Sequence, residues 1–295
     1  MSSAVIDAHH HVWRQADLDW LQGEERPRIF GPYRPIMRDY LVEEFIADAA
    51  PSGVARSVYV QANWPNSRAF EEAAWVQGEG ERAGMIGGII AFADFADPGV
   101  GAHLDRLRAL PALRGVRQQL HWHRTPLYQF AARPNLSDDP DWRRGFALLA
   151  PTGLLFELQV FAGQANPAER LVRDFPDQTF VLEHAGMLED RSDTGWAEWR
   201  GFMARLAQHP NVCTKLSGLG TFLRAARAED WAPVVRPTLD LFGPERCLFG
   251  SNFPIEKLWT SYADLFATFS TCIDHLDEAG RRAVLHDTAA RLYSP

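Results

Sequence analysis

A run of three histidines near the N-terminus is the first group whose spacing could support chemistry. His9, His10 and His11 end an apolar segment that begins at Val5. Because alternate residues of a strand face the same side, we expect His9 and His11 to converge while His10 points away. Two imidazoles on one face at a strand end can hold a divalent metal or bind an oxyanion. The alternative is a polar strand end whose histidines only serve the core.

Charged residues also interrupt later apolar segments. Arg117 and Lys215 each lie within such a segment, where an unpaired charge is costly to bury. Each is therefore expected either to pair with an acid or to bind an anionic group of a substrate. Glu157 shares a strand face with Gln159 and is a candidate general base, but a structural pairing with Lys215 or an arginine is equally open.

Further polar and aromatic side chains follow the apolar segments and could contact a substrate. The hydrogen-bonding candidates are Gln61, Asn63, His121 and His123. The candidates for pocket walls are Trp13, Trp64 and Trp122. The chain has ten tryptophans, so some of them are expected to serve only the core.

These residues are positioned by an alternation of short β-type segments and longer amphipathic ones. The β-type segments are residues 5–9, 56–62, 85–93, 115–120, 154–161, 179–184, 212–216 and 247–251. The helical segments are residues 39–50, 68–83, 99–109, 141–151, 165–175, 195–208, 231–241 and 261–276, with a closing helix over 277–293. Eight such alternations predict an α/β fold, a single (β/α)8 TIM-like barrel over residues 1–295, and an open doubly wound sheet is the alternative. Long loops over 13–38 and 121–139 follow strands 1 and 4, so we expect both on the catalytic face.

Composition limits the classes of function. The formal net charge of -8 argues against a nucleic-acid partner. The cysteines Cys213, Cys247 and Cys272 fit neither a zinc ribbon nor a disulfide framework, which favours buried free thiols in a reducing compartment. The first residues lack the basic and apolar regions of a signal peptide, and no apolar run approaches the roughly 20 residues that span a membrane. We therefore expect a cytoplasmic protein with no membrane partner.

A family resemblance runs through the whole chain. The elements that carry it are, in order, IDAHHHVW, SVYVQANW, RGVRQQLHWH, FELQVF, FVLEHAG, NVCTKLSGL, RCLFGSNFP and HDTAARLY. Together they resemble the amidohydrolase superfamily of the amidohydrolase 2 type, in the branch of sugar-lactone and 2-pyrone-4,6-dicarboxylate hydrolases. The resemblance places the family's strand-6 histidine at His184. It implies a reaction centre of His9, His11 and His184, and these three are also the candidate metal ligands.

The eighth strand departs from the family pattern. Superfamily members usually carry an aspartate there, which ligates metal and takes a proton from water, whereas this chain has Asn252. An amide cannot act as a base and is a poor anionic ligand. Glu157 and Glu256 are replacement candidates, and Glu157 is favoured because it shares a face with Gln159. The resemblance implies one divalent metal, zinc or manganese, while Asn252 leaves a metal-independent reaction open.

The leading functional hypothesis is a hydrolase that opens a lactone of a small polar or carboxylated substrate by attack of an activated water. A non-oxidative decarboxylase of the same superfamily is the second hypothesis. A catalytically impaired barrel that only binds ligand is the third, and Asn252 is the residue that favours it. The expected partner is a small molecule, and a homo-oligomer is left open.

Overall fold

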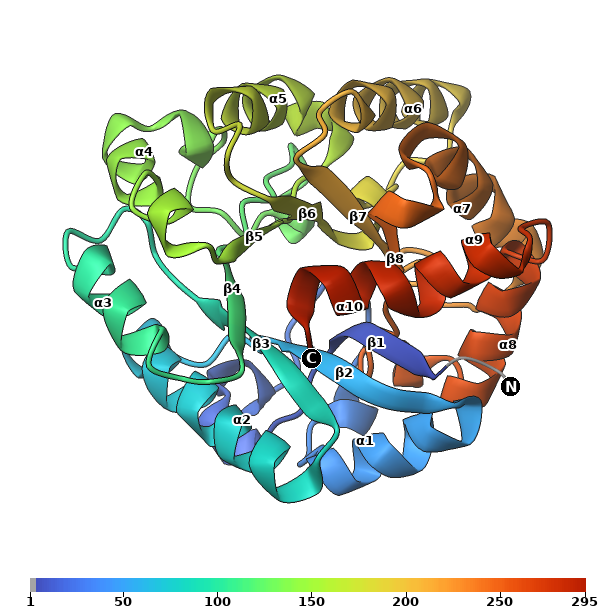
Figure 1. Ribbon diagram of the computed structural model, residues 1–295, viewed down its shortest axis with the longest axis horizontal. Coiled ribbons are helices and arrows are strands. Elements are labelled where there is room, and N and C mark those ends of the chain that lie inside the picture. The colour runs from blue at the N-terminus through green and yellow to red at the C-terminus, as the bar shows by residue number, and fades with distance from the viewer. Residues whose placement is uncertain (1–3) are drawn as a thin grey trace.

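Eight parallel strands form the centre of the protein, as the computed structural model describes it for residues 4–295 (Figure 1). Each strand pairs with the next along the chain, in the order β1 to β8. The strands are β1 Val5–His10, β2 Val54–Val60, β3 Ile86–Phe92, β4 Leu113–Arg117, β5 Leu155–Leu158, β6 Phe180–Leu182, β7 Val212–Leu216 and β8 Cys247–Phe249. Their residues are almost all buried, which is the pattern of parallel strands covered on both faces.

Backbone hydrogen bonds just beyond β8 join the last strand to the first. The amide of Asn252 donates to the carbonyl of His9 at 2.7 Å, and the amide of His11 donates to the carbonyl of Phe253 at 2.7 Å. These bonds bring the ends of the sheet together, so the predicted (β/α)8 barrel is confirmed and the open sheet is excluded.

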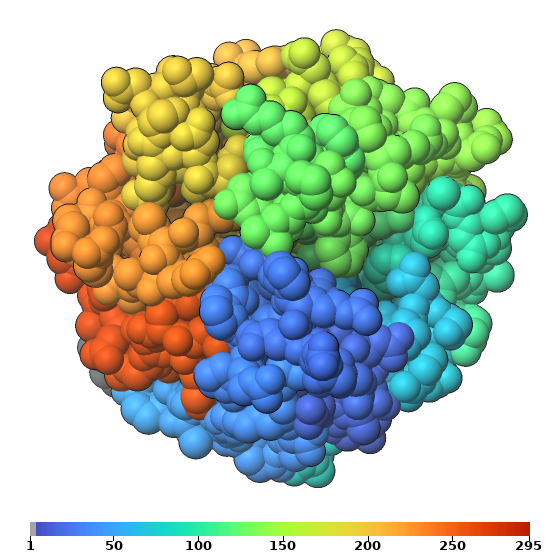
Figure 2. Space-filling model, turned by 180° about the vertical axis from the view of Figure 1, so that it is seen from behind, coloured from blue at the N-terminus to red at the C-terminus, as the bar shows by residue number. Residues whose placement is uncertain are grey.

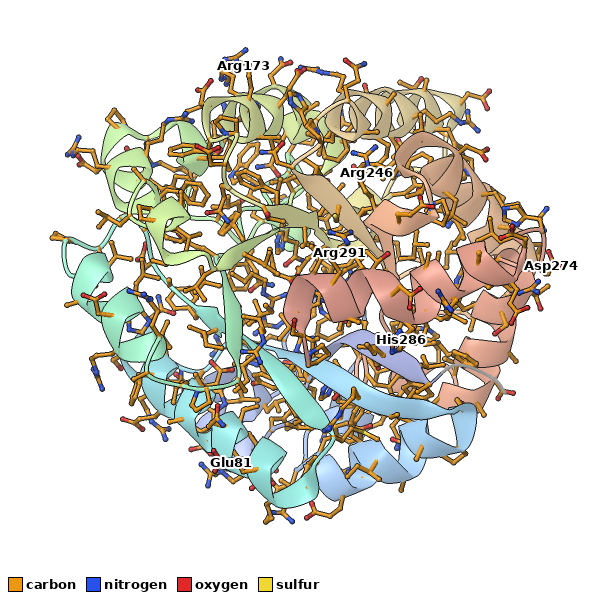
Figure 3. All side chains as sticks on the ribbon, in the orientation of Figure 1. Glu81, Arg173, Arg246, Asp274, His286 and Arg291 are labelled. Carbon is orange, nitrogen blue, oxygen red and sulfur yellow. The ribbon has the colours of Figure 1, made fainter. Side chains whose placement is uncertain are left out.

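Helices follow the strands and cover the outside of the barrel. They are α1 Val42–Ala49, α2 Ala69–Ala83, α3 Val100–Leu107, α4 Pro140–Phe146, α5 Ala165–Asp174, α6 Asp193–Ala207, α7 Ala228–Phe242 and α8 Tyr262–Cys272. Their apolar faces pack onto the strands, while charged side chains such as Glu81, Arg173 and Asp274 project outward from the ring (Figure 3).

The C-terminal segment closes one end of the barrel. It comprises α9 Glu278–Arg282, a π-helical turn over Ala283–Asp287 and α10 Thr288–Tyr293, where the sequence predicted one continuous helix. In Figure 1, α10 crosses the centre of the ring of strands. Its Ala289 and Tyr293 belong to the inner cluster that includes Ile6, Leu155 and Cys213 from the strands. This end is therefore sealed, and access is left at the opposite end, where the carboxyl ends of the strands lie.

Loops gather over that opposite end (Figure 2). The segment between β1 and α1, blue in the figure, contains three short 3-10 helices, and the segment between β4 and α4, green, contains two. Tyr128 of the second loop packs edge-on against Phe222, which follows β7, with ring centroids 5.6 Å apart. Loops from three strands thus surround the mouth of the barrel.

Two predictions that bear on the chemical environment can be compared with the structure. All three cysteines are buried and free, as predicted. Within residues 4–295, none of the helices has both the length and the apolar character needed to cross a membrane. The expectation of no signal peptide rests partly on Met1–Ser3, which lie outside the described residues.

Candidate active site

The histidines at the end of β1 converge as predicted. The ring of His9 lies 5.1 Å from that of His11, measured between centroids, whereas His10 turns away and stacks on Phe45 at 3.8 Å. Ile6 of the same strand packs in the inner cluster. Even-numbered residues such as Ile6 therefore face the barrel interior at the start of β1, whereas the odd-numbered His9 faces it at the end. The pairing register with β2 slips within the same stretch of the strand.

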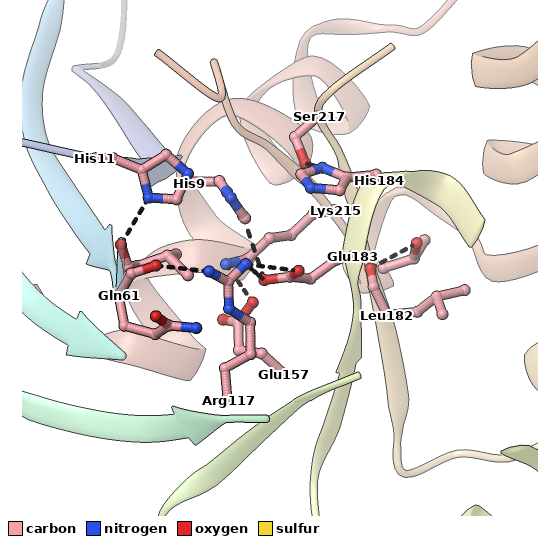
Figure 4. A network of polar contacts seen from close by, with 12 residues as sticks. His9, His11, Gln61, Arg117, Glu157, Leu182, Glu183, His184, Lys215 and Ser217 are labelled. Atoms are coloured by element: carbon pink, nitrogen blue, oxygen red, sulfur yellow. Dashed lines mark hydrogen bonds and ion pairs between the residues drawn. The ribbon is translucent and has the colours of Figure 1, made fainter. Parts of the chain in front are cut away.

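The contact of His11 with β2 fixes its tautomer. Its Nδ1 lies 2.7 Å from the carbonyl oxygen of Val60, which can only accept, so Nδ1 carries the proton (Figure 4). Nε2 of His11 then keeps its lone pair. Burial, with the charge of Arg117, lowers the pKa of His11 to about 3, so the ring is neutral near pH 7.

His184 reaches the site through an unusual backbone conformation. It follows β6 with φ 55°, and Ala185 after it has φ 47°, both left-handed. This turn ends β6 at Leu182, short of the predicted end at residue 184. It also brings the His184 ring to 4.7 Å from His9 between centroids, with Nδ1 2.9 Å from the Oγ of Ser217. Burial is the main cause that lowers the pKa of His184 to about 4.

A buried ion pair joins β4 to the end of β6. The Nη1 of Arg117 lies 3.1 and 3.0 Å from the two carboxylate oxygens of Glu183, and its Nη2 donates to the carbonyl of Gln61 at 2.6 Å (Figure 4). Burial is the largest single influence on Glu183 and raises its pKa, but the charges of Arg117, His184 and Lys215 together outweigh it and the result is a pKa of about 2. The sequence left open whether Arg117 pairs with an acid or binds substrate, and the structure shows that it pairs.

A second buried pair lies deeper in the barrel. Lys215 of β7 is 2.6 Å from the carboxylate of Glu157 on β5, and both side chains are fully buried. Tyr293 from α10 donates to the other oxygen of Glu157 at 2.6 Å. Burial raises the pKa of Glu157 to about 7, although Lys215 opposes that shift. The structure thus shows the structural pairing that the sequence left open beside a catalytic role.

Asn252 stands where the family pattern has an aspartate. Asn252 has φ 57°, and its backbone N–H donates a hydrogen bond to the carbonyl of His9, which places the residue beside the histidines. Glu256, the other replacement candidate, is buried and accepts from Nε1 of Trp259 at 2.9 Å and from Oγ1 of Thr221 at 3.3 Å. Burial raises the pKa of Glu256 to about 8.

A cavity of about 100 Å³ opens at the mouth of the barrel, above these side chains. Its polar wall includes six predicted residues: His11, His184, Arg117, Asn252, Gln61 and Asn63. Trp13 also lines it, as predicted. His9, Glu157 and Lys215 are not on its wall but lie buried close beneath it, in the polar network of Figure 4.

Besides Lys215, four predicted substrate contacts lie away from the cavity wall. His121 is buried between the rings of Phe130 and Phe161, and His123 lies 3.5 Å from Glu189. Trp64 stacks on Trp75, and Trp122 is half-buried on the loop after β4. These four positions follow strand ends in the sequence, but the loops carry their side chains elsewhere.

A metal-ligating set is present, although it differs from the predicted one. Ligand atoms of His9, Glu157 and Glu183 all lie within 4.8 Å of one another, and neither ring nitrogen of the fully buried His9 has a hydrogen-bond partner among residues 4–295. One imidazole and two carboxylates suit a divalent ion such as zinc. The predicted set of His9, His11 and His184 shares only His9 with it.

Glu183, which lies in the buried network beneath the cavity, and several residues of the cavity wall were not anticipated. Glu183 could have been found from alternation, because Val181, two residues earlier, faces the inner cluster and Glu183 shares its parity. No periodic signal marks Trp20, Arg28 and Phe30 from the loop after β1, or Phe222 from the loop after β7. Only the folded loops bring them to the cavity.

Comparison with known proteins gives a consistent result. The amidohydrolase family model matches residues 6–294. The uncharacterized protein y4mH of Sinorhizobium fredii is 36% identical, with 98% of each chain covered. The L-fucono-1,5-lactonase of Burkholderia multivorans is 30% identical, over 100% of this chain and 97% of that protein. A crystal structure of an amidohydrolase from Burkholderia multivorans with bound zinc superimposes with a TM-score of 0.84, at 29% identity over 99% of each chain.

Proposed function

This chain belongs to the amidohydrolase family, and on that premise we propose that it hydrolyses a lactone of a small polar molecule. The observation that carries the proposal is the cavity wall, which unites His11, His184, Arg117 and Asn252 at the carboxyl ends of the strands. A relative aligned over the whole chain bears the name of a lactonase. Donors and neutral imidazoles around one small cavity suit water attack on a cyclic ester.

His11 is the residue we assign as general base. Its Nδ1 proton is committed to the carbonyl of Val60 at 2.7 Å, which leaves Nε2 as the acceptor. In the reaction, Nε2 takes a proton as the water oxygen bonds to the ester carbon. The ring C–O bond then breaks, and the proton passes to the leaving oxygen, which becomes the hydroxyl of the open hydroxy acid.

Arg117 and Asn252 are the donors for the oxyanion that forms on the ester carbonyl. The guanidinium is held by Glu183 and by the carbonyl of Gln61, so it is already oriented before substrate binds. Its Nε has no partner among the described residues. A preoriented donor of this kind stabilises developing negative charge without reorganisation.

His9, Glu157 and Glu183 would hold a divalent metal, because their donor atoms are close together and the ring of His9 makes no competing hydrogen bond within the described part of the chain. A bound ion would supply a Lewis acid for the carbonyl or lower the pKa of a water. The two carboxylates already have cationic partners in Arg117 and Lys215. The metal would therefore compete with these cations, and we propose that it binds weakly.

Glu157 as general base remains a prediction, and its pairing with Lys215 beneath the cavity supports the assignment to His11 instead. We also propose that the protein acts in the cytoplasm, on the ground that its three cysteines are free and buried. A homo-oligomer and the absence of nucleic-acid binding stay predictions.

The test is hydrolysis of a panel of sugar lactones by the purified protein, followed by proton release, with and without added zinc and with a chelator. We expect turnover of at least one lactone and no release of carbon dioxide from aromatic carboxylates. Carbon dioxide release without lactone opening would favour the decarboxylase. Inactivity of the wild type together with activity of Asn252→Asp would show that the natural protein is an impaired barrel.

A further inference from the structure

The cavity wall includes a cationic side chain, from the loop after β1, that has no role in the proposed reaction. Arg28 lines the cavity wall, half-buried, and its guanidinium lies over the ring of Trp20 at 5.5 Å from the centroid. Within residues 4–295 no carboxylate lies within ion-pair distance of Arg28, whereas Arg14 and Arg68 of the same region both pair with Asp17. Arg117, the other arginine on the wall, is paired with Glu183. Arg28 is therefore free to bind a ligand.

The loop holds Arg28 in place rather than leaving it mobile. Trp20 is anchored by its Nε1, which donates to the carbonyl of Ala62 at 2.9 Å, and its carbonyl accepts from the hydroxyl of Tyr33 at 3.2 Å. The carbonyl of Arg28 accepts from the amide of Gly31 at 2.9 Å, which closes a turn. An arginine stacked on a fixed aromatic ring is preorganised, so it loses little side-chain entropy on binding.

The charge of the whole cavity favours an anion. Among the described residues that line it there are two neutral histidines and no aspartate or glutamate, and of its two arginines only Arg117 has an ion-pair partner, so the charge of Arg28 is left uncompensated. The chain as a whole has a net charge of -8, so the cavity is a local basic site in an acidic protein. A concave basic site concentrates anionic ligands near it.

We propose that Arg28 forms a carboxylate subsite, so that the preferred substrate is a lactone bearing a free carboxylate. This inference rests on the proposed lactone hydrolysis and adds the substrate class to it. The substrate carboxylate binds Arg28 on the loop side, while the ester carbonyl lies between His11 and the donors Arg117 and Asn252. The guanidinium fork matches a carboxylate bidentately. A single free arginine suits the one charge of a carboxylate better than a phosphate dianion, which usually has several donors.

The experiment compares two lactones of the same ring size and stereochemistry. One is an aldonolactone with a terminal hydroxymethyl group, and the other is the aldarolactone with a carboxylate in its place. We expect the wild type to prefer the aldarolactone. Arg28→Gln should raise its KM for the aldarolactone by about 10- to 100-fold, as expected for loss of a hydrogen bond to a charged group, and change the aldonolactone by less than about twofold. Arg28→Lys, which keeps the charge but not the fork, should fall between.

Arg26→Gln is the matched control, because Arg26 is exposed on the same loop and is not on the cavity wall. It should leave both KM values unchanged. Equal use of the two lactones by the wild type, or an equal loss on both in Arg28→Gln, overturns the proposal. Preference for a phosphorylated lactone over the aldarolactone overturns the carboxylate assignment as well.

A binding measurement separates this proposal from the proposed activity. By calorimetry, the wild type should bind the ring-opened dicarboxylate more tightly than the monocarboxylate, and Arg28→Gln should abolish the difference. If neither lactone is hydrolysed but this difference is found, the subsite stands and lactone hydrolysis is rejected. If both are hydrolysed and the difference is missing, the subsite is rejected and hydrolysis stands.

Discussion

The Lys215–Glu157 pair inside the barrel is expected to contribute to stability as one tightly coupled unit. The two charged groups are 2.6 Å apart and fully buried. At an effective dielectric constant of about 20, their attraction is about 6 kcal/mol, and the cost of removing both charges from water offsets much of it. Removal of one partner leaves the other as an uncompensated charge. We therefore expect Lys215→Met and Glu157→Gln each to lower the free energy of unfolding by about 3–5 kcal/mol.

The double variant Lys215→Met/Glu157→Gln should cost much less than the sum of the two single changes, because it leaves no buried charge unpaired. A glutamine at 157 can still accept from the hydroxyl of Tyr293. We expect a coupling energy of about 2 kcal/mol or more, within the range found for contacting residues. The measurement is urea unfolding followed by circular dichroism, with a chelator present so that metal binding does not contribute.

The exposed pair Arg236–Asp274, at 3.3 Å, is the matched control. Its double-mutant cycle should give a coupling of about 0–1 kcal/mol, as is usual at the surface. If the buried cycle were additive to within about 0.5 kcal/mol, or if it matched the exposed cycle, the inference that the pair is a tightly coupled buried unit would be wrong.

Three further predictions concern catalysis, metal and pH. His11→Ala should reduce kcat by about 100- to 10,000-fold on any lactone that is turned over, with a melting temperature close to that of the wild type; comparable activity would exclude it as the base. Lys215→Met should bind zinc more tightly than the wild type in calorimetry, because Glu157 loses its competing cation; unchanged affinity would place the metal elsewhere. Burial raises the pKa of Glu72 from its ordinary value of 4.5 to about 7. Between about pH 4.5 and 7 the folded state therefore holds a proton that the unfolded state has released. The free energy of unfolding of the wild type falls as pH rises through that window. Glu72→Gln should flatten this fall, by up to about 3 kcal/mol between pH 5 and 8 in urea unfolding; parallel pH profiles would contradict the assignment.

Local pattern was enough to predict the scaffold and part of the site. Hydrophobic periodicity in the sequence predicts the eight apolar segments and the helices between them, because each element must bury an apolar face in any compact fold. The same reasoning placed His9 and His11 on one side of the strand and His10 on the other, and the three rings have this arrangement in the structure. Charged residues within apolar strands, such as Arg117 and Lys215, were expected either to pair with an acid or to bind a ligand, because burial of an unpaired charge is costly in free energy.

The partners and the cavity wall were decided only by the tertiary structure. Arg117 pairs with Glu183 and Lys215 with Glu157 because β4, β5, β6 and β7 point these side chains into one closed barrel, a relation between strands that no local pattern contains. His184 joins His9 through two left-handed residues after β6, which strand alternation does not predict. Arg28 reaches the cavity because its loop folds over the mouth of the barrel around Trp20. Sequence therefore determined which residues lie along each strand, while closure of the barrel and the course of its loops determined which of them meet.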